Sequence, residues 1–85
     1  MDNSQLQILN VYPNPTIGLT SVQIKSKLKD TKLYLINALG YIINEFDVSN
    51  LTEFSFNLEH YPVGTYQLVL VQGGFFSSLK SLILN

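Results

Sequence analysis

The segment Phe54-Ser55-Phe56-Asn57-Leu58 decides the fold class, because apolar and polar residues alternate along all of it. Successive side chains of a β-strand point to opposite faces, so this alternation predicts a strand with one face in a core and the other in solvent. Six further windows are rich in β-branched, aromatic or leucine residues, which favour strands. They are residues 6–12, 20–25, 32–36, 41–46, 66–71 and 79–84.

Turn-forming residues separate these windows at intervals of about ten residues, a spacing typical of all-β sandwiches and barrels. The clearest turn is Gly73-Gly74, because two adjacent glycines adopt a primed two-residue turn without strain and so predict a hairpin. Seven short strands with one apolar face each are best buried as two antiparallel sheets packed face to face. The sequence therefore predicts an all-β fold, a seven-stranded antiparallel immunoglobulin-like β-sandwich.

Two of the expected strands are apolar or aromatic on both faces. They contain Leu33-Tyr34-Leu35-Ile36 and Leu68-Val69-Leu70-Val71. This composition indicates central strands whose outer face is either covered or in contact with a partner.

Length and composition limit the chain to one folded domain. Its 85 residues can bury one small core but not two, and 46 % apolar residues with only 13 % charged ones argue against disorder. The first residues, 1–4, have neither the basic nor the apolar region of a signal peptide, and no stretch of the sequence approaches the roughly 20 apolar residues of a membrane-spanning helix. We expect residues 1–5 to be a remnant of a linker or of cloning, and residues 6–85 to be a domain excised from a longer protein.

Charge and residue types argue against several functions. Five lysines, no arginine and six carboxylates give a net charge of −1, so no basic field is available to bind nucleic acid. The absence of cysteine removes disulfides and thiol chemistry. His60 beside Glu59 is the only adjacent acid–base pair, and one loop histidine lacks the convergent partners of a metal or catalytic site. The sequence predicts neither an enzyme nor a cofactor or metal site.

Four motifs follow one another over nearly the whole chain. They are Tyr12-Pro13-Asn14-Pro15-Thr16-Ile17-Gly18, residues 33–43 with Asn37-Ala38-Leu39-Gly40 inside them, residues 58–66 with Pro62-Val63-Gly64-Thr65-Tyr66 at their end, and Lys80-Ser81-Leu82-Ile83. Their order and spacing closely resemble the type A C-terminal sorting domain of the type IX secretion system of Bacteroidota-type bacteria.

The resemblance implies that the chain is a secretion signal. It would direct an N-terminally fused cargo from the periplasm across the outer membrane to the cell surface or the extracellular space, where a surface sortase usually removes the signal. The implied partners are the type IX translocon, its shuttle proteins, the sortase and the cargo. Neither nucleic-acid binding nor membrane insertion is expected.

The first motif has a physical explanation of its own. Pro13 and Pro15 fix their φ angles and push the residue before each into extended geometry. Residues 13–18, with Asn14 and Thr16 among them, are therefore expected to form a stiff crossing between strands, which Gly18 ends with its free φ. The alternative is that this crossing is a directly contacted recognition feature.

The third motif and the loop glycines are expected to serve the fold. Gly40 and Gly64 stand where strands restart after loops, at positions that a Cβ would strain, with Pro62 helping to fix the second of these turns. Tyr66 is expected to place its ring in the core and its hydroxyl on a partner at the edge, like the tyrosine corners of sandwich domains.

The last strand carries the candidate recognition residues Lys80, Leu82, Ile83, Leu84 and Asn85. One interpretation is that Lys80 blocks unwanted pairing at an edge strand. The other is that a shuttle protein reads the free edge of this strand by β-augmentation, with the Lys80 ammonium fixing the register. A free apolar edge also leaves self-association open.

Two further functions stay open at this stage. A carbohydrate-binding or adhesive sandwich would expose a row of aromatic rings on one face, and the chain has no tryptophan for it. The rings that could replace it belong to Tyr12, Tyr34, Tyr41, Phe75 and Phe76. A structural spacer within a surface protein would not need its last strand for export.

Overall fold

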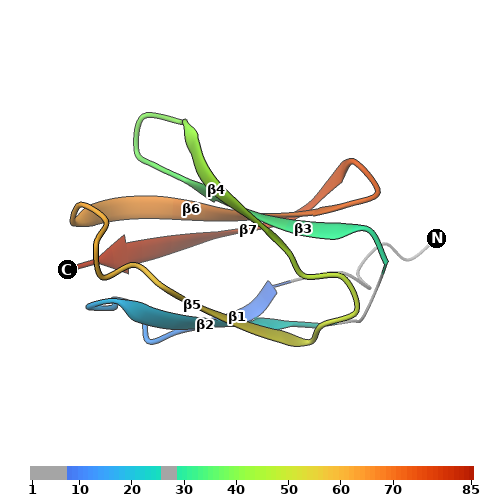
Figure 1. Ribbon diagram of the computed structural model, residues 1–85, viewed down its shortest axis with the longest axis horizontal. Helices are drawn as coiled ribbons and strands as arrows, with labels where there is room; N and C mark the ends of the chain where they lie inside the picture. The colour runs from blue at the N-terminus through green and yellow to red at the C-terminus, as the bar shows by residue number, and fades with distance from the viewer. Residues whose placement is uncertain (1–7, 26–28) are drawn as a thin grey trace.

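The computed structural model, described for residues 8–25 and 29–85, is a sandwich of two antiparallel sheets (Figure 1). One sheet has the strand order β1-β2-β5 and the other β4-β3-β6-β7. The strands are β1 (Ile8–Tyr12), β2 (Leu19–Ile24), β3 (Thr31–Ile36), β4 (Ile42–Asp47), β5 (Glu53–Asn57), β6 (Gly64–Gln72) and β7 (Phe75–Leu84). A parallel bridge between Thr16 and Leu84 adds an eighth, very short extended segment.

The predicted all-β sandwich is confirmed, and the structure describes no helix in these residues. Each expected strand is present, with boundaries close to those predicted except at the start of β7. The expected remnant at residues 1–5, and residues 6–7 of the first expected strand, lie outside the described residues.

The hairpin between β6 and β7 forms as the two glycines predict. Gly73 and Gly74 have φ angles of 59° and 84°, and Gln72 pairs with Phe75 across the turn. β7 therefore begins four residues before the expected start at residue 79. The early part of β7 lacked a recognisable alternation because the pairing shifts register between Leu70 and Val71, which breaks the period of two.

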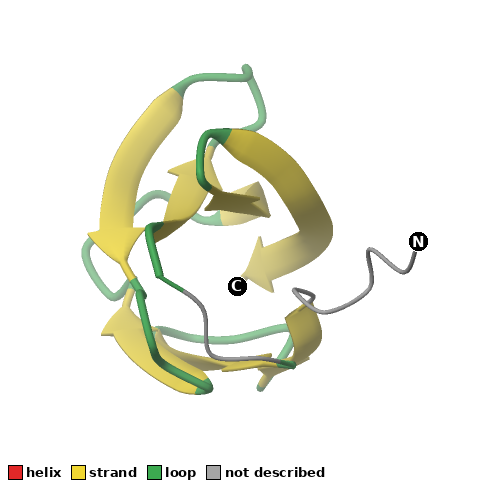
Figure 2. Ribbon diagram, turned by 90° about the vertical axis from the view of Figure 1, so that its right-hand side faces the viewer, coloured by secondary structure: helices red, strands yellow, loops and turns green. Residues whose placement is uncertain are grey.

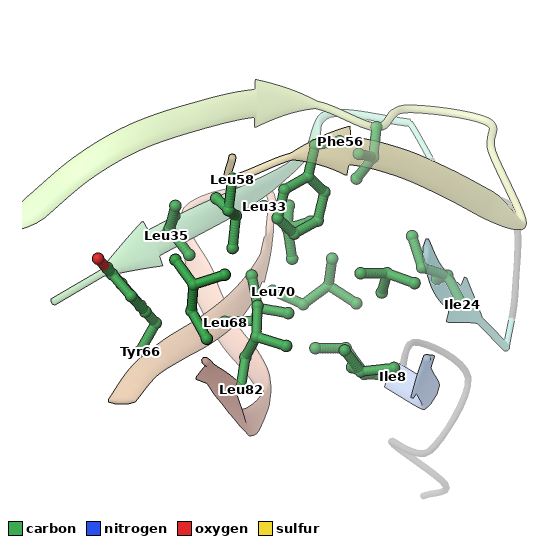
Figure 3. Close-up of a cluster of buried hydrophobic side chains, with 14 residues drawn as sticks. Ile8, Ile24, Leu33, Leu35, Phe56, Leu58, Tyr66, Leu68, Leu70 and Leu82 are labelled. Carbon is green, nitrogen blue, oxygen red and sulfur yellow. The ribbon is translucent and has the colours of Figure 1, made fainter. Parts of the chain in front are cut away.

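The core lies between the inner faces of the two sheets, where side chains from every second position meet (Figure 3). The central strands β3 and β6 contribute Leu33, Leu35, Leu68 and Leu70, each with no exposed surface. Figure 2, viewed along the long axis, shows both sheets curving around this interior. The core side chains are Ile8, Val11, Val22, Ile24, Leu33, Leu35, Val48, Phe56, Leu58, Tyr66, Leu68, Leu70, Leu82 and Leu84.

The prediction that strands β3 and β6 are central is also confirmed. On their outer face, Tyr34 of β3 pairs with Val69 of β6, and both side chains are half-buried. Neighbouring side chains on the same sheet thus cover part of this apolar face.

Three phenylalanines bridge the sheets where their edge strands β4 and β5 approach each other. The ring centroid of Phe46 lies 5.0 Å from that of Phe54 and 5.2 Å from that of Phe56. Aromatic rings at such distances contribute roughly 0.5–1.5 kcal/mol per pair beyond the area that they bury. The cluster closes one side of the sandwich without any backbone pairing between the sheets.

The burial pattern gives a matched test of the core. Ile24→Val removes one methylene at a side chain that is 2 % exposed, so we expect it to cost about 0.5–1.5 kcal/mol of the free energy of unfolding. Ile42→Val makes the same change in β4 at a side chain that is 60 % exposed, and it should cost much less. Urea unfolding of both variants measures this difference; equal costs would contradict the described core.

Candidate functional site

The motif segments gather at one end of the sandwich. Residues 13–18 connect β1 to β2 there, residues 58–63 lead from β5 into β6, and residues 37–41 connect β3 to β4. The final residues of β7 reach the same end, because Leu84 pairs with Gly64 and bridges to Thr16. Figure 1 shows the C-terminus at this end and the β6–β7 hairpin at the other. We call this end, comprising residues 13–18, 37–41, 58–64 and 83–85, the motif end.

The crossing of residues 13–18 runs along the outer edge of β7 and pairs with it. The Asn14 side chain donates from Nδ2 to the Ser81 carbonyl at 2.9 Å, and its Oδ1 accepts the Ile83 N–H at 3.0 Å. Two backbone bonds of 2.8 Å follow, from Thr16 N–H to the Ile83 carbonyl and from Asn85 N–H to the Thr16 carbonyl. No local pattern in the sequence indicates these contacts of Asn14, because their partners lie 67 and 69 residues away.

The edge of β7 is therefore occupied from Ser81 to Asn85, so the expectation that this edge is free is wrong. The hydrogen-bonding groups that a shuttle protein would need already bond to Asn14 and Thr16. The crossing has become the neighbouring strand of β7, which sequence periodicity could not show.

Thr16 and Gly18 fix the route from the crossing into β2. The Thr16 side chain is 2 % exposed, donates from Oγ1 to the Leu19 carbonyl at 3.0 Å, and accepts the Gly18 N–H at 3.1 Å. The expectation that Gly18 supplies a special φ is wrong, since its φ lies outside the left-handed region. An added Cβ would instead lie 3.1 Å from Asn57 Oδ1, so a larger residue at this position requires the Asn57 side chain to shift.

The candidate recognition residues of β7 divide into two groups. Leu82 and Leu84 are 0 % and 4 % exposed and belong to the core, so a partner cannot contact their side chains while the sandwich is intact. Lys80, Ile83 and Asn85 are exposed. Lys80 pairs with Leu68 and projects from the same face of β7 as Leu82, but its side chain is exposed at the edge of the sheet. A charge on this face of an edge strand disfavours pairing with a further chain.

Tyr66 forms the corner that the sequence predicted. Its side chain is 4 % exposed, and its hydroxyl donates to the Pro62 carbonyl four residues earlier. In Figure 3 the ring lies at one end of the core with its oxygen directed away from it. Burial, with a smaller effect of the neighbouring Tyr61, raises the pKa of Tyr66 above its ordinary value of 10.0. This bond ties the turn before β6 to the core.

Gly40 and Asn37 shape the loop after β3. Gly40 has a φ of 92°, which strains any residue with a Cβ, as predicted. Asn37 Oδ1 accepts the N–H groups of Leu39 and Tyr41, each at 3.0 Å. Asn37 thus organises this loop; it was not among the predicted site residues, although an asparagine in a turn is a known signal for such side-chain bonds.

A groove of about 410 Å³ separates this loop from the turn before β6. We call it the loop groove. Side chains at its rim are apolar and far out in solvent, with Leu39 81 % and Val63 72 % exposed. Its lining consists of residues 37–39, Ile43 and residues 61–66.

The described residues offer little chemistry elsewhere. They contain no group of three or more His, Cys, Asp or Glu side chains that could hold a metal ion, and no helix long and apolar enough to cross a membrane.

His60 is exposed in the turn after β5. Hydrogen bonds from Ser49 lower the pKa of Asp47, and the bond to Glu53 raises the pKa of Tyr12; both pairs are exposed.

Comparison with models of protein families matches residues 10–85 to the secretion system C-terminal sorting domain. The chain belongs to this family. A search of curated proteins gave no match. The matched region includes all four motifs, so the resemblance read from the sequence is confirmed.

A sorting domain of this family is the C-terminal signal for type IX secretion. The function is export of an N-terminally fused cargo across the outer membrane to the cell surface or the extracellular space. The family is one of sorting signals and not of enzymes. The motif end is therefore the candidate functional site of a secretion signal.

The carbohydrate-binding alternative gains no support from the sorting domain's structure. The five rings proposed for a binding face lie on separate parts of the fold. Tyr12 ends β1 in one sheet, Tyr34 lies on the outer face of β3 in the other, Tyr41 belongs to the β3–β4 loop, and Phe75 and Phe76 begin β7. As successive strand residues, Phe75 and Phe76 also point to opposite faces.

Tyr66→Phe tests the corner bond. Losing the hydroxyl should cost about 1 kcal/mol of the free energy of unfolding at neutral pH. Because the folded-state pKa of Tyr66 is raised, its contribution is complete below pH 10 and is lost as the pH rises through that pKa. The difference between wild type and Tyr66→Phe should thus shrink under alkaline conditions.

Urea unfolding at neutral and at alkaline pH measures this change. Tyr41→Phe, at a ring that is 67 % exposed, is the matched control and should stay close to wild type at neutral pH. An equal cost for the two variants would contradict the corner assignment.

Proposed function

We propose that the type IX machinery recognises the motif end of the sorting domain. The translocon and its shuttle proteins bind there, and a surface sortase removes the domain after export. The observation that carries this proposal is the polarity of the fold. The motif segments meet at one end of a molecule whose extents are 38 × 22 × 19 Å. The cargo joins at the N-terminal side, and β1 begins at Ile8, which pairs with Ile24 and donates from its N–H to the Ser78 hydroxyl, away from the motif end.

This polarity suits a signal that must work with many cargoes. Because the described chain enters the fold at Ile8, away from the motif end, an N-terminally fused cargo need not cover that end. Recognition at the motif end would then depend on the sorting domain alone, whatever the size or fold of the cargo.

The motif end also has the chemistry of a protein contact surface. Leu39 and Val63 present apolar side chains to solvent on both sides of the loop groove. Loops held by internal bonds, such as those of Asn37 and Tyr66, present their side chains at little entropic cost. On β7, Ile83 and Asn85 are the exposed recognition candidates at this end, with Lys80 farther along the strand.

Export of a fluorescent reporter tests the signal as a whole. The reporter carries an N-terminal signal peptide and the sorting domain at its C-terminus, in a host with an intact type IX system and in one without the outer-membrane translocon. We expect export only in the intact host, and loss of export when residues 80–85 are removed. Equal retention of folded reporter in both hosts would contradict the signal function.

Paired surface variants test the location of the recognition surface. Leu39→Ser with Val63→Ser alters the motif end, whereas Phe75→Ser with Phe76→Ser makes a comparable change at the hairpin end, where these rings are 78 % and 66 % exposed. We expect the first pair to reduce export at least several-fold and the second to leave it near wild type. The reverse result would place recognition at the hairpin end.

A further inference from the structure

The contact between the crossing and β7 has the hydrogen-bond pattern of a strand pair. Along the outer edge of β7, the Ser81 carbonyl, the Ile83 N–H, the Ile83 carbonyl and the Asn85 N–H each have a partner in the crossing, at 2.8 to 3.0 Å. The last two partners are backbone groups of Thr16. The first two belong to the side chain of Asn14, which is 67 residues away from Ser81 in sequence.

At neutral pH the carboxamide of Asn or Gln can make both bonds of a peptide unit. It presents an N–H donor and a carbonyl acceptor side by side. At Asn14 the donor meets a carbonyl and the acceptor meets an N–H, so the side chain occupies the place of a peptide group in a neighbouring strand. Aspartate at this position would keep the acceptor but lose the donor, and alanine would lose both.

The flanking prolines explain why a side chain has this role. Pro13 and Pro15 have no N–H and cannot donate to a strand edge, so the backbone of the crossing cannot continue a regular ladder through these positions. Their fixed φ angles also limit the conformations of the crossing before it contacts β7, which lowers the entropy lost on contact. In the Pro-Asn-Pro segment, the Asn14 side chain thus makes the two hydrogen bonds to β7 that the backbone of a regular strand would make.

We infer that Asn14 is a positioning residue of the secretion signal: its carboxamide acts as a substitute peptide unit that holds the end of β7 in the sandwich, and the domain is exported efficiently only when this contact is made. The inference rests on the proposed recognition at the motif end. It joins the first motif and the last one into a single unit, in which Asn14 fixes the backbone that presents Ile83 and Asn85.

The hydrogen bonds between Asn14 and β7 also lie at an exposed position, where they can break without unfolding the core. Asn14 is exposed, so water competes for both of its bonds, whereas Leu82 and Leu84 on the inner face are buried. Strand ends with exposed hydrogen bonds open at a lower free energy than the core. Loss of the Asn14 contact should therefore loosen residues 83–85 while the rest of the sandwich stays folded.

Amide hydrogen exchange tests the contact without any secretion assay. In Asn14→Ala we expect the Ile83 amide to exchange roughly tenfold faster, since it loses its acceptor, while the amides of β3 keep their rates. Ser55→Ala is the matched control. It removes an exposed side-chain bond, to Ser21 at 2.7 Å, on the sheet that does not contain β7. It should leave the Ile83 rate unchanged.

Asn14→Asp separates hydrogen bonding from shape. Above the ordinary aspartate pKa of about 4, its carboxylate can still accept from the Ile83 N–H, but it places a negative oxygen against the Ser81 carbonyl oxygen, and this repulsion pushes the side chain away from β7; below it, the protonated acid regains a donor beside an acceptor. The variant should therefore protect the Ile83 amide poorly at neutral pH and close to wild type at about pH 3, each rate taken relative to wild type at the same pH. A purely steric role for residue 14 predicts the same ratio at both pH values and would overturn the inference.

Export of the reporter fusion completes the test. Asn14→Ala should reduce export several-fold with its melting temperature close to that of Ser55→Ala, which should export normally. Faster Ile83 exchange with undiminished export would overturn the positioning role and leave recognition at the motif end intact. If instead the Leu39 and Val63 variant exports normally while Asn14→Ala does not, recognition at the loop groove fails, and the positioning of Ile83 and Asn85 by Asn14 stands.

Discussion

The sandwich depends on β7 being held along both of its edges. On one edge it pairs with β6 from Gly64 to Gln72, which places Leu82 and Leu84 in the core. On the other edge Asn14 and Thr16 complete the hydrogen bonding of its last residues. A domain of this size has only one small core, so a terminal strand with one unpaired edge would be a weak point in it. The crossing after β1 removes that weakness.

The same constraint links the architecture to the function. A secretion signal needs no reactive groups, since its work is to be recognised and carried with its cargo. Its motif residues accordingly fix turns and edges. Thr16 and Gly18 direct the crossing, Tyr66 ties down the turn before β6, and Gly40 closes the loop after β3. Together they hold one end of the sandwich in a defined shape, away from the start of β1.

The exposed apolar side chains have a different physical status from the core. Leu39 and Val63 gain nothing from the sandwich itself, because their surfaces remain in water. They stand beside the loop groove on backbone that internal hydrogen bonds hold in place. An apolar surface on a rigid frame is the arrangement that loses least entropy when a partner covers it.

The sequence by itself determined the strands, the β6–β7 hairpin, the corner at Tyr66 and the family. These follow from local chemistry: a period of two, glycines at positive φ, a tyrosine four residues after its acceptor, and motifs in a fixed order. Only the tertiary structure decided that Asn14 pairs with β7, that Gly18 lies against the Asn57 side chain, and that Leu82 and Leu84 are core residues while Ile83 is exposed. The reason is that sheet order and register bring together residues far apart in the chain, and the period of a strand does not specify which neighbour completes its edge.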